Sequence, residues 1–289
     1  MLNVIAGIQA AAAENSLAPA IIGGQRALAY GELLDVIARA SGYVADRGLA
    51  SRARVALNIG DPIFRLVISL AAMHCGAIPL VVPDLRDLRR GADYDVILGA
   101  DVLENPAERP DIVVGRKAIG AEGPPAPLRI FADRADNDPL FLFRAGEKSG
   151  RGALAVETRE SLRRWTGEGE GGGLALGRVD RHVSTFSEAG RDGFALYLAT
   201  LAAGAVFVRP RAQPLELLRA TVSWGVTVLT SETSLLFDLV GLMEAMKVVC
   251  RSVRAVAVLG TAPPKSLVAR IGGVFNERVA VRTLSPGNF

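Results

Sequence analysis

The sequence predicts an α/β protein built as two stacked α/β lobes, each with a mostly parallel sheet flanked by helices. Short apolar runs of strand type alternate along the chain with amphipathic helical segments, and the connections between them are short. The chain has 289 residues, 50% of them hydrophobic, which is enough to bury a large core and to divide into two lobes. A Gly- and Pro-rich stretch at 120–127 is a break between lobes or a long surface loop, and as a break it places the first lobe at 1–127 and the second at 128–289.

The first half of the chain contains a strand–helix–strand unit, which implies parallel strands. Asp61 and Pro62 mark the start of its helix, because Asp is a favoured N-cap and Pro fits the first helical position. Gly23 and Gly24 predict the turn of a small hairpin. In order, we expect a helix at 1–15, a hairpin at 20–30, a helix from 31 to the stop at Gly48, a strand at 55–59, a helix at 61–75, and strands at 78–82, 95–98 and 112–114.

The second half continues the alternation after a central hairpin. Residues 140–156 read as two apolar strands joined by a Gly-rich turn, and 157–165 as a helix. Beyond a flexible Gly/Glu tract at 167–172, we expect strands at 182–186, 206–208, 226–229, 253–259 and 279–281, with helices at 193–203, 214–224, 232–247 and 264–271.

The composition limits the chemistry and the partners. The formal net charge is +3, and no basic block interleaves with aromatic residues, so we expect no nucleic-acid binding. A His-rich metal site is excluded because His74 and His182 are the only histidines. The absence of a G-x-S-x-G motif excludes the nucleophile elbow of the α/β hydrolases.

The same inspection indicates a cytoplasmic protein. Cys75 and Cys250 are far apart in apolar surroundings, which favours a reducing compartment over a disulfide framework. Residues 1–15 carry no Lys or Arg before their apolar part, so they fit a first helix better than a signal peptide. The most apolar segment, 66–82, is interrupted by Pro79 and is too short for a membrane span.

The central Gly-rich turn is the first candidate for a binding site. Gly146 and Gly150 leave backbone N–H groups free to face an anion, and Lys148 and Arg151 place positive charge at the same tip. A hairpin loop with solvated charges is the alternative. The turn is no P-loop, because the second glycine of that motif would fall on Arg151. The G-x-G-x-x-G match at 167–172 contains two glutamates that would repel a pyrophosphate.

Four stretches, taken in order, carry a resemblance to a known family. They read AYGELL at 29–34, CGAIPLVVPD at 75–84, LAAGAVFVRP at 201–210 followed by WGVTVL at 224–229, and VRAVAVLGTAP at 253–263. In this order they resemble motifs in the N-terminal part of the adenylate-forming (AMP-binding) enzymes, the acyl-CoA synthetases, peptide-synthetase adenylation domains and luciferases. The resemblance implies the two-lobed fold of that N-terminal domain.

The resemblance also implies where ligands would bind. The Gly-rich turn corresponds to the family's phosphate loop, so ATP or AMP phosphates would approach Gly146, Lys148, Ser149, Gly150 and Arg151. The loop that lies along the adenine corresponds to Gly260, Thr261, Ala262 and Pro263. A plain strand-to-helix turn remains the alternative for this second loop. An acyl ligand and a protein partner are the further partners that the resemblance suggests.

Several positions depart from the family pattern. The hydroxyl run of the phosphate loop is reduced to Ser149, and Glu147 puts a carboxylate beside the phosphates, which like charges disfavour. Gly287 and Asn288 stand where the family has the Thr and the Glu that would hold phosphate and Mg²⁺. We also expect the mobile C-terminal domain with its catalytic Lys to be absent. No catalytic residue is therefore assigned, and this chain alone is not expected to hold Mg²⁺.

Three functions remain open on the sequence. The first is a degenerate acyl-CoA synthetase-like protein, which acts as a non-catalytic or partner-dependent module that binds a nucleotide or an acyl group. The second is an active ATP-dependent ligase that converts a carboxylate to an acyl-adenylate. The third is a Rossmann-type oxidoreductase, which fits the α/β pattern but has no credible dinucleotide fingerprint.

Overall fold

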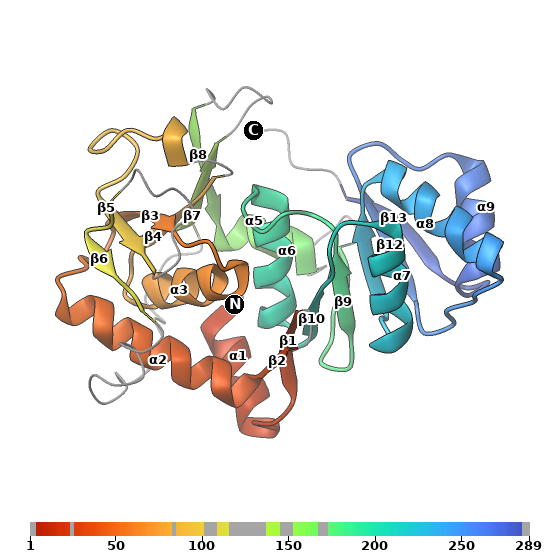
Figure 1. The fold of residues 1–289 in the computed structure, drawn as a ribbon, viewed down its shortest axis with the longest axis horizontal. Coiled ribbons are helices and arrows are strands. Elements are labelled where there is room, and N and C mark those ends of the chain that lie inside the picture. The colour runs from red at the N-terminus through yellow and green to blue at the C-terminus, as the bar shows by residue number, and fades with distance from the viewer. Residues whose placement is uncertain are drawn as a thin grey trace. The chain divides into compact units, whose positions relative to one another are not determined.

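The computed structural model describes residues 4–23, 26–82, 85–100, 109–115, 137–144, 153–166 and 173–284 (Figure 1). They form two mostly parallel mixed sheets flanked by helices, which confirms the predicted fold class. The chain divides into two compact units that are not consecutive segments. Unit 1 comprises Met1–Ala18, Tyr30–Ser161 and Glu188–Phe194, and unit 2 comprises Pro19–Ala29, Leu162–Ser187 and Ala195–Phe289.

The sheet of unit 1 has the strand order β6-β5-β3-β4-β7-β8. Every described pair is parallel except β7 and β8, which form an antiparallel hairpin with Arg144 opposite Leu154. The two strands predicted within 140–156 are therefore confirmed. The bounds are β3 (Arg54–Asn58), β4 (Ile78–Val81), β5 (Val96–Gly99), β6 (Ile112–Val113), β7 (Pro139–Arg144) and β8 (Leu154–Thr158).

The helices of unit 1 begin and end where local chemistry dictates. The Oδ1 atom of Asp61 accepts a hydrogen bond from the Phe64 N–H at 3.0 Å, so Asp61 caps the helix that Pro62 opens. The chain leaves that helix through Gly76 at φ +86°, a conformation that glycine adopts without a Cβ penalty. The bounds are α1 (Val4–Glu14), α2 (Tyr30–Asp46), α3 (Pro62–His74) and the short 3₁₀ turn η1 (Leu85–Asp87).

The sheet of unit 2 has the strand order β13-β12-β11-β9-β10-β1-β2. All its described pairs are parallel except the hairpin β1–β2. The strands are β1 (Pro19–Gly23), β2 (Arg26–Ala29), β9 (Arg181–Ser184), β10 (Val206–Arg209), β11 (Val228–Ser231), β12 (Ala255–Leu259) and β13 (Ala280–Leu284). The helices are α7 (Pro214–Ser223), α8 (Thr233–Met246) and α9 (Lys265–Val274), while α5 (Arg159–Thr166) and α6 (Arg191–Ala202) each contribute to both units.

The two faces of this sheet are covered by different helices. Val183, Val208 and Leu229 point to the core formed with α7, α8 and α9. Their neighbours on the strands point the other way, as shown by His182, which contacts Thr200 of α6. Figure 1 shows α6 and α7 on opposite sides of β9 and β10. The five consecutive strands β9 to β13 therefore have the doubly wound order 2-1-3-4-5, whose chain reversal lies between β9 and β11.

The observed units differ from the lobes expected at 1–127 and 128–289. Ile21 of β1 pairs with Phe207 of β10, so the first hairpin joins the sheet of unit 2. Leu80 of β4 pairs with Leu142 of β7, so the central hairpin joins the sheet of unit 1. One local prediction was wrong. Glu157 and Thr158 belong to β8 rather than to the following helix, because both pair with β7.

Candidate functional site

The carboxyl ends of β9 and β11 carry a group of hydroxyl side chains in unit 2. The hydroxyl of Thr185 donates to Oγ of Ser231 at 3.3 Å, and Ser231 in turn donates to the Glu232 carbonyl at 3.2 Å. Ser184 accepts from the Phe186 N–H at 3.3 Å. In doubly wound sheets, ligands bind outside the carboxyl ends of the strands at the point of chain reversal. The hydroxyls therefore lie at the edge where this architecture favours a ligand.

The loop at 260–263 leaves the same edge of the same sheet, after β12. Gly260 has φ +88°, and its N–H donates to the Leu284 carbonyl of β13 at 2.9 Å. A Cβ added to Gly260 would meet no atom of the described residues within 4 Å, so this part of the structure leaves the outer side of the turn open. Thr261 and Ala262 are exposed, and Pro263 is half-buried. A flat group could thus lie along this loop without displacing atoms of the residues that the structure describes.

Of the two loops predicted to bind a nucleotide, the structure describes only one. Gly260, Thr261, Ala262 and Pro263 are all described and form one continuous turn between β12 and α9. The predicted phosphate-loop residues lie outside the described residues: Gly146, Lys148, Ser149, Gly150 and Arg151. Their anchor is described, because β7 runs parallel to β4 and ends at Arg144 on the carboxyl edge of its sheet. The two loops belong to different units, so each is described on its own.

A buried ionic cluster in unit 1 was not predicted from the sequence. The Nε atom of Arg191 donates to Oε2 of Glu157 at 2.9 Å, and the Glu157 side chain is fully buried. The Arg191 guanidinium also lies over the ring of Phe143, 4.7 Å from its centroid. The start of α6 is thereby tied to both strands of the hairpin that carries the Gly-rich turn. The only sign of this cluster in the sequence is Glu157 next to an apolar run, and the sequence pattern places Glu157 in a helix.

Two oxygens of this cluster are left without partners. Oε1 of Glu157 and Oδ1 of Asp192 are buried and have no hydrogen-bond partner among the described residues. Burial raises the pKa of Asp192, the positive charge of Arg191 lowers it in part, and the negative charge of Glu157 raises it further. The cluster can therefore accept further hydrogen bonds from a donor group.

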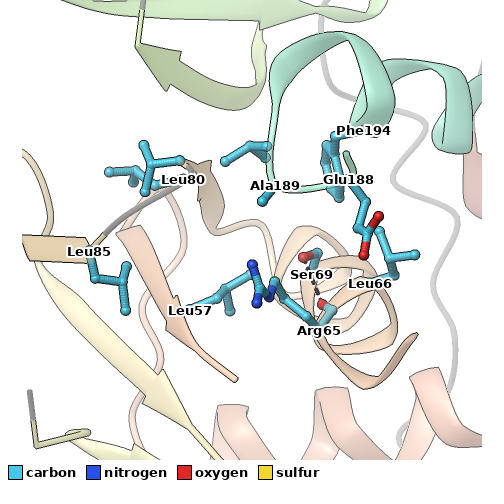
Figure 2. A pocket seen from close by; sticks show the side chains of 11 residues that line it. Leu57, Arg65, Leu66, Ser69, Leu80, Leu85, Glu188, Ala189 and Phe194 are labelled. Atoms are coloured by element: carbon cyan, nitrogen blue, oxygen red, sulfur yellow. Dashed lines mark hydrogen bonds between the residues drawn. The ribbon is translucent and has the colours of Figure 1, made fainter. Parts of the chain in front are cut away.

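A small cavity lies between α3, β4 and the residues that open α6 (Figure 2). Its walls are mainly apolar side chains, with Arg65, Ser69 and Glu188 as the polar ones. The Ser69 hydroxyl donates to the Arg65 carbonyl at 2.8 Å. The cavity has a volume of about 10 Å³, which is room for about one water molecule. It is too small to hold an acyl group.

Neither a metal centre nor a membrane span emerges from the part of the chain that is described. No group of three or more His, Cys, Asp or Glu side chains is placed to hold a metal ion within those residues. None of the described helices combines the length and the apolarity that crossing a membrane requires.

Comparison with known proteins identifies the fold. No family model and no curated protein matches the sequence. Among solved structures, the AMPPNP-bound form of the nonribosomal peptide synthetase FmoA3 matches 99% of this chain with a TM-score of 0.80 at 20% identity. An inhibitor-bound N-terminal domain of FACL13 from Mycobacterium tuberculosis matches 100% of the chain with a TM-score of 0.76 at 13% identity. The N-terminal subdomain of NpsA from Klebsiella oxytoca, in complex with 3-hydroxybenzoyl-AMSN, matches 99% with a TM-score of 0.77 at 16% identity.

The length of these matches is informative. The chain spans 31% of the FmoA3 chain, but 76% and 73% of the FACL13 and NpsA N-terminal structures. The likeness thus extends over nearly the whole of this chain and most of an isolated N-terminal subdomain. The motif resemblance is confirmed at the level of architecture: the chain has the fold of the N-terminal region of the adenylate-forming, AMP-binding proteins.

Proposed function

We propose that this chain is a nucleotide- and acyl-binding module of the adenylate-forming class that does not itself form acyl-adenylates. The observation that carries the proposal is the open turn at Gly260, which leaves the ligand-binding edge of a sheet in a fold shared with an AMPPNP-bound protein. The open outer side of Gly260 and the exposed Thr261 and Ala262 fit a planar adenine lying along the loop. The adenine would contact the loop through its face and its edge, as a small ligand does in a largely pre-formed site.

The phosphates of the nucleotide would approach the Gly-rich turn through their charge. Lys148 and Arg151 would neutralise phosphate oxygens, while the backbone N–H groups near Gly146 and Gly150 would donate to them. Glu147 opposes this binding because its carboxylate repels the phosphates. We therefore infer weaker nucleotide binding than a hydroxyl-rich loop of the same length would give.

We infer that this chain is not catalytic because it lacks groups that the reaction needs. Transfer of an adenylyl group to a carboxylate builds negative charge around phosphorus, which metal ions, lysines and loop N–H groups stabilise. In this chain Ser149 is the only hydroxyl in the turn, and Gly287 and Asn288 stand where the family motif has its Thr and its Glu. A partner protein that supplied these groups would make the module partner-dependent.

Nucleotide binding is tested by calorimetric titration with ATP, AMP, NAD and an acyl-CoA. Binding of adenine nucleotides is expected, and replacing Lys148 and Arg151 together by Ala should weaken ATP binding in a salt-dependent way. The matched control is Arg278→Ala, which removes an exposed positive charge in unit 2. Unchanged ATP affinity in the double variant would remove the phosphate role of the Gly-rich turn.

The active-ligase alternative is tested by carboxylate-dependent exchange of labelled pyrophosphate into ATP. The panel contains aliphatic, aryl and amino acids with Mg²⁺ present. We expect exchange no faster than in a sample without protein. Turnover at the rates of ordinary enzymes with any acid would restore the ligase function.

The oxidoreductase alternative loses support from the sheet order. The strands β9 to β13 follow the order 2-1-3-4-5, whereas dinucleotide-binding sheets follow 3-2-1-4-5-6. Tight binding of NAD without binding of ATP in the same titration would revive it.

A further inference from the structure

The strands β9 to β13 of unit 2 are parallel, so they all begin at one edge of their sheet, which we call the amino edge. Helices α7, α8 and α9 end at this edge, because each one returns the chain to the start of the next strand. The Thr227 N–H donates to the Arg181 carbonyl at 2.9 Å, and the Arg254 N–H donates to the Thr227 carbonyl at 2.8 Å. The Ala280 N–H donates to the Arg254 carbonyl at 2.9 Å. The segments that precede β9, β11, β12 and β13 are therefore direct neighbours.

Exposed apolar side chains gather at the amino edge. Of the ten large hydrophobic side chains that are exposed in the described part of the chain, five belong to this edge. They are Val179, Val222, Trp224, Met246 and Val249, and their exposed fractions run from 36% for Trp224 to 89% for Val179. A single exposed apolar residue needs no explanation, but half of them on one edge of one sheet indicate a contact surface.

The same edge carries an excess of positive charge. Four exposed cations lie at the start of β9 or in the segments that precede β12 and β13: Arg181, Lys247, Arg251 and Arg278. Within the described part of the chain none of them forms an ion pair, and the Arg181 guanidinium donates to the Trp224 carbonyl at 2.6 Å instead. Arg254 is not counted, because Asp180 pairs with it at 2.7 Å. Against the four cations stands one exposed carboxylate, Glu277, which leaves an excess of three positive charges.

The stability of unit 2 accounts for only part of this arrangement. A cation near a helix C-terminus is favourable, and Lys247 and Arg251 follow the end of α8. The exposed apolar side chains contribute little to folding, because water still surrounds much of their surface. Val179 is the clearest case, since it precedes β9 and is 89% exposed. A partner that is both anionic and apolar would use the two features together.

A lipid bilayer with anionic headgroups has both properties. Its surface attracts Lys and Arg side chains, and the long stems of these residues can lie along apolar groups while the charge stays in water. The layer below the headgroups accepts apolar side chains. Trp is enriched at this depth, because its ring is apolar and its N–H can still find an acceptor.

The size of the amino edge favours a lipid surface over a protein partner. Three strand spacings separate β9 from β13, which is about 15 Å. With the helix layer included, the edge offers about 300 Å² if it is roughly 20 Å wide. A stable protein interface covers about 800 Å² on each partner. A bilayer needs no such area, because charge attraction and a few inserted side chains are enough for reversible binding.

We propose that the amino edge of unit 2 docks reversibly on the anionic headgroups of a lipid bilayer. The cations pair with headgroup phosphates and carboxylates, while Val179, Trp224 and Val249 enter the layer below. The turn at Gly260 leaves the carboxyl end of β12, at the opposite edge of the sheet, so the docked chain keeps that turn accessible. Docking goes beyond the proposed nucleotide and acyl binding and does not depend on it.

Sedimentation with sucrose-loaded vesicles measures the docking directly. One set of vesicles contains phosphatidylcholine alone, and the other contains phosphatidylcholine and phosphatidylserine in equal parts. We expect the chain to sediment with the anionic vesicles and to stay in solution with the neutral ones, and added salt should weaken the binding. Vesicles with brominated acyl chains should quench the emission of Trp224, whereas Trp165 is buried in the protein.

Two double variants separate this edge from general charge attraction. Lys247→Asn/Arg251→Gln removes two charges from the amino edge, and Asn suits the φ of +56° at position 247. Its partition coefficient on anionic vesicles should fall at least about tenfold. The matched control is Arg211→Gln/Lys265→Gln, which removes two exposed charges from the carboxyl edge of the same sheet and should retain most of the binding.

The apolar contribution has its own variant. Val179→Ser/Val249→Ser keeps every charge and should weaken binding at least about threefold, because less apolar surface enters the bilayer. All the substituted positions are exposed, so urea denaturation should show that each variant remains folded.

Two results would overturn the proposal. One is the absence of sedimentation with the anionic vesicles at low salt, in which case the edge would fit an acidic protein instead. The other is an equal loss of binding in the amino-edge variant and in the carboxyl-edge control, because net charge alone would then drive the binding. Neither result bears on the titrations with ATP and AMP, so the two proposals fail separately.

Discussion

The Nε atom of Arg191 lies 2.9 Å from Oε2 of Glu157, and this contact ties the first turn of α6 to the strand β8. Both side chains are largely removed from water, so neither charge can be solvated if the other is lost. The pair therefore fixes the position of the hairpin that carries the Gly-rich turn.

Loss of this pair should destabilise the protein strongly. Replacing Arg191 by Met leaves the buried Glu157 carboxylate uncompensated, which typically costs about 3–5 kcal/mol of unfolding free energy. The control is Arg219→Met, because Arg219 forms an exposed pair with Glu216 and should change stability by less than about 1 kcal/mol. Urea denaturation of both variants checks the prediction. Equal stabilities of the two variants would contradict it.

Asp180 should be a second anchor, in unit 2. Its carboxylate accepts hydrogen bonds from Arg254 Nε at 2.8 Å, Arg254 Nη2 at 2.7 Å, the Gly177 N–H at 2.7 Å and the Thr227 hydroxyl at 2.7 Å. Burial alone would raise its pKa, but these hydrogen bonds and the charge of Arg254 lower it. Because the buried Asp180 carboxylate would lose charge-assisted hydrogen bonds, the Asp180→Asn variant should lose about 2 kcal/mol or more of unfolding free energy in urea denaturation at neutral pH.

The matched control for Asp180 is an exposed pair of similar geometry. Glu244 accepts from Arg270 Nε at 2.9 Å and Arg270 Nη2 at 2.7 Å on the surface. The Glu244→Gln variant should therefore lose less than about 1 kcal/mol. A loss as large as that of Asp180→Asn would show that burial is not the cause.

His182 should make the stability depend on pH. Its Nδ1 lies 2.6 Å from the Thr200 hydroxyl and its Nε2 lies 3.1 Å from the Thr230 hydroxyl. Burial lowers the pKa of His182 to about 3, with the charge of Asp180 opposing this in part. Between that pKa and the ordinary value of about 6.5, the unfolded chain binds a proton that the folded chain does not. Stability is thus fully present above the ordinary pKa and is lost as the pH falls toward the folded one.

The size of this pH effect on stability follows from the protonation of the histidine in the unfolded chain. Between about pH 7 and pH 5 the protonation of an unfolded histidine should remove about 2 kcal/mol of unfolding free energy. The His182→Gln variant can still hydrogen-bond both threonines but has no proton to gain. Denaturation at each pH should show a shallower slope for the variant than for the unsubstituted chain. Parallel slopes would mean that His182 is protonated in the folded protein.

Two glycines should respond in opposite directions to replacement by alanine. Gly260 has φ +88°, so Gly260→Ala should lose about 1 kcal/mol or more although the site has space for a Cβ. Gly273 lies within α9, has no positive φ, and would meet no atom within 4 Å. Gly273→Ala should therefore gain about 0.5–1 kcal/mol. Thermal denaturation of both variants measures the two signs, and the same sign in both would contradict the argument.

The local structure could be predicted from the sequence wherever short-range chemistry decides it. Asp61 and Pro62 predicted the start of α3 correctly, and the first hairpin was predicted correctly from the apolar runs that became β1 and β2. The alternation of apolar runs gave the mostly parallel sheets. These features depend on residues only a few positions apart.

The division into units and the buried cluster could not be predicted in the same way. The pairing of Ile21 with Phe207 depends on the fit of distant strands, which no local pattern encodes. Glu157 and Arg191 are far apart in sequence, and each looks like a surface charge by itself. For the candidate site, the motif resemblance located the turn at Gly260, while the hydroxyls Thr185 and Ser231 became visible only once their strands were neighbours.

The strand β1 has a consequence for how the polypeptide is made. Its hairpin partner β2 is synthesised immediately after it, but its parallel neighbour β10 leaves the ribosome only after most of unit 1. Until then the hairpin has an unpaired edge, and edges of this kind invite association with other chains. A gene fragment that began after Ser161 would likewise expose the edge of β10 for good. Neither unit can therefore be cut out as one continuous piece, and the chain should complete its folding only after β10 has been made.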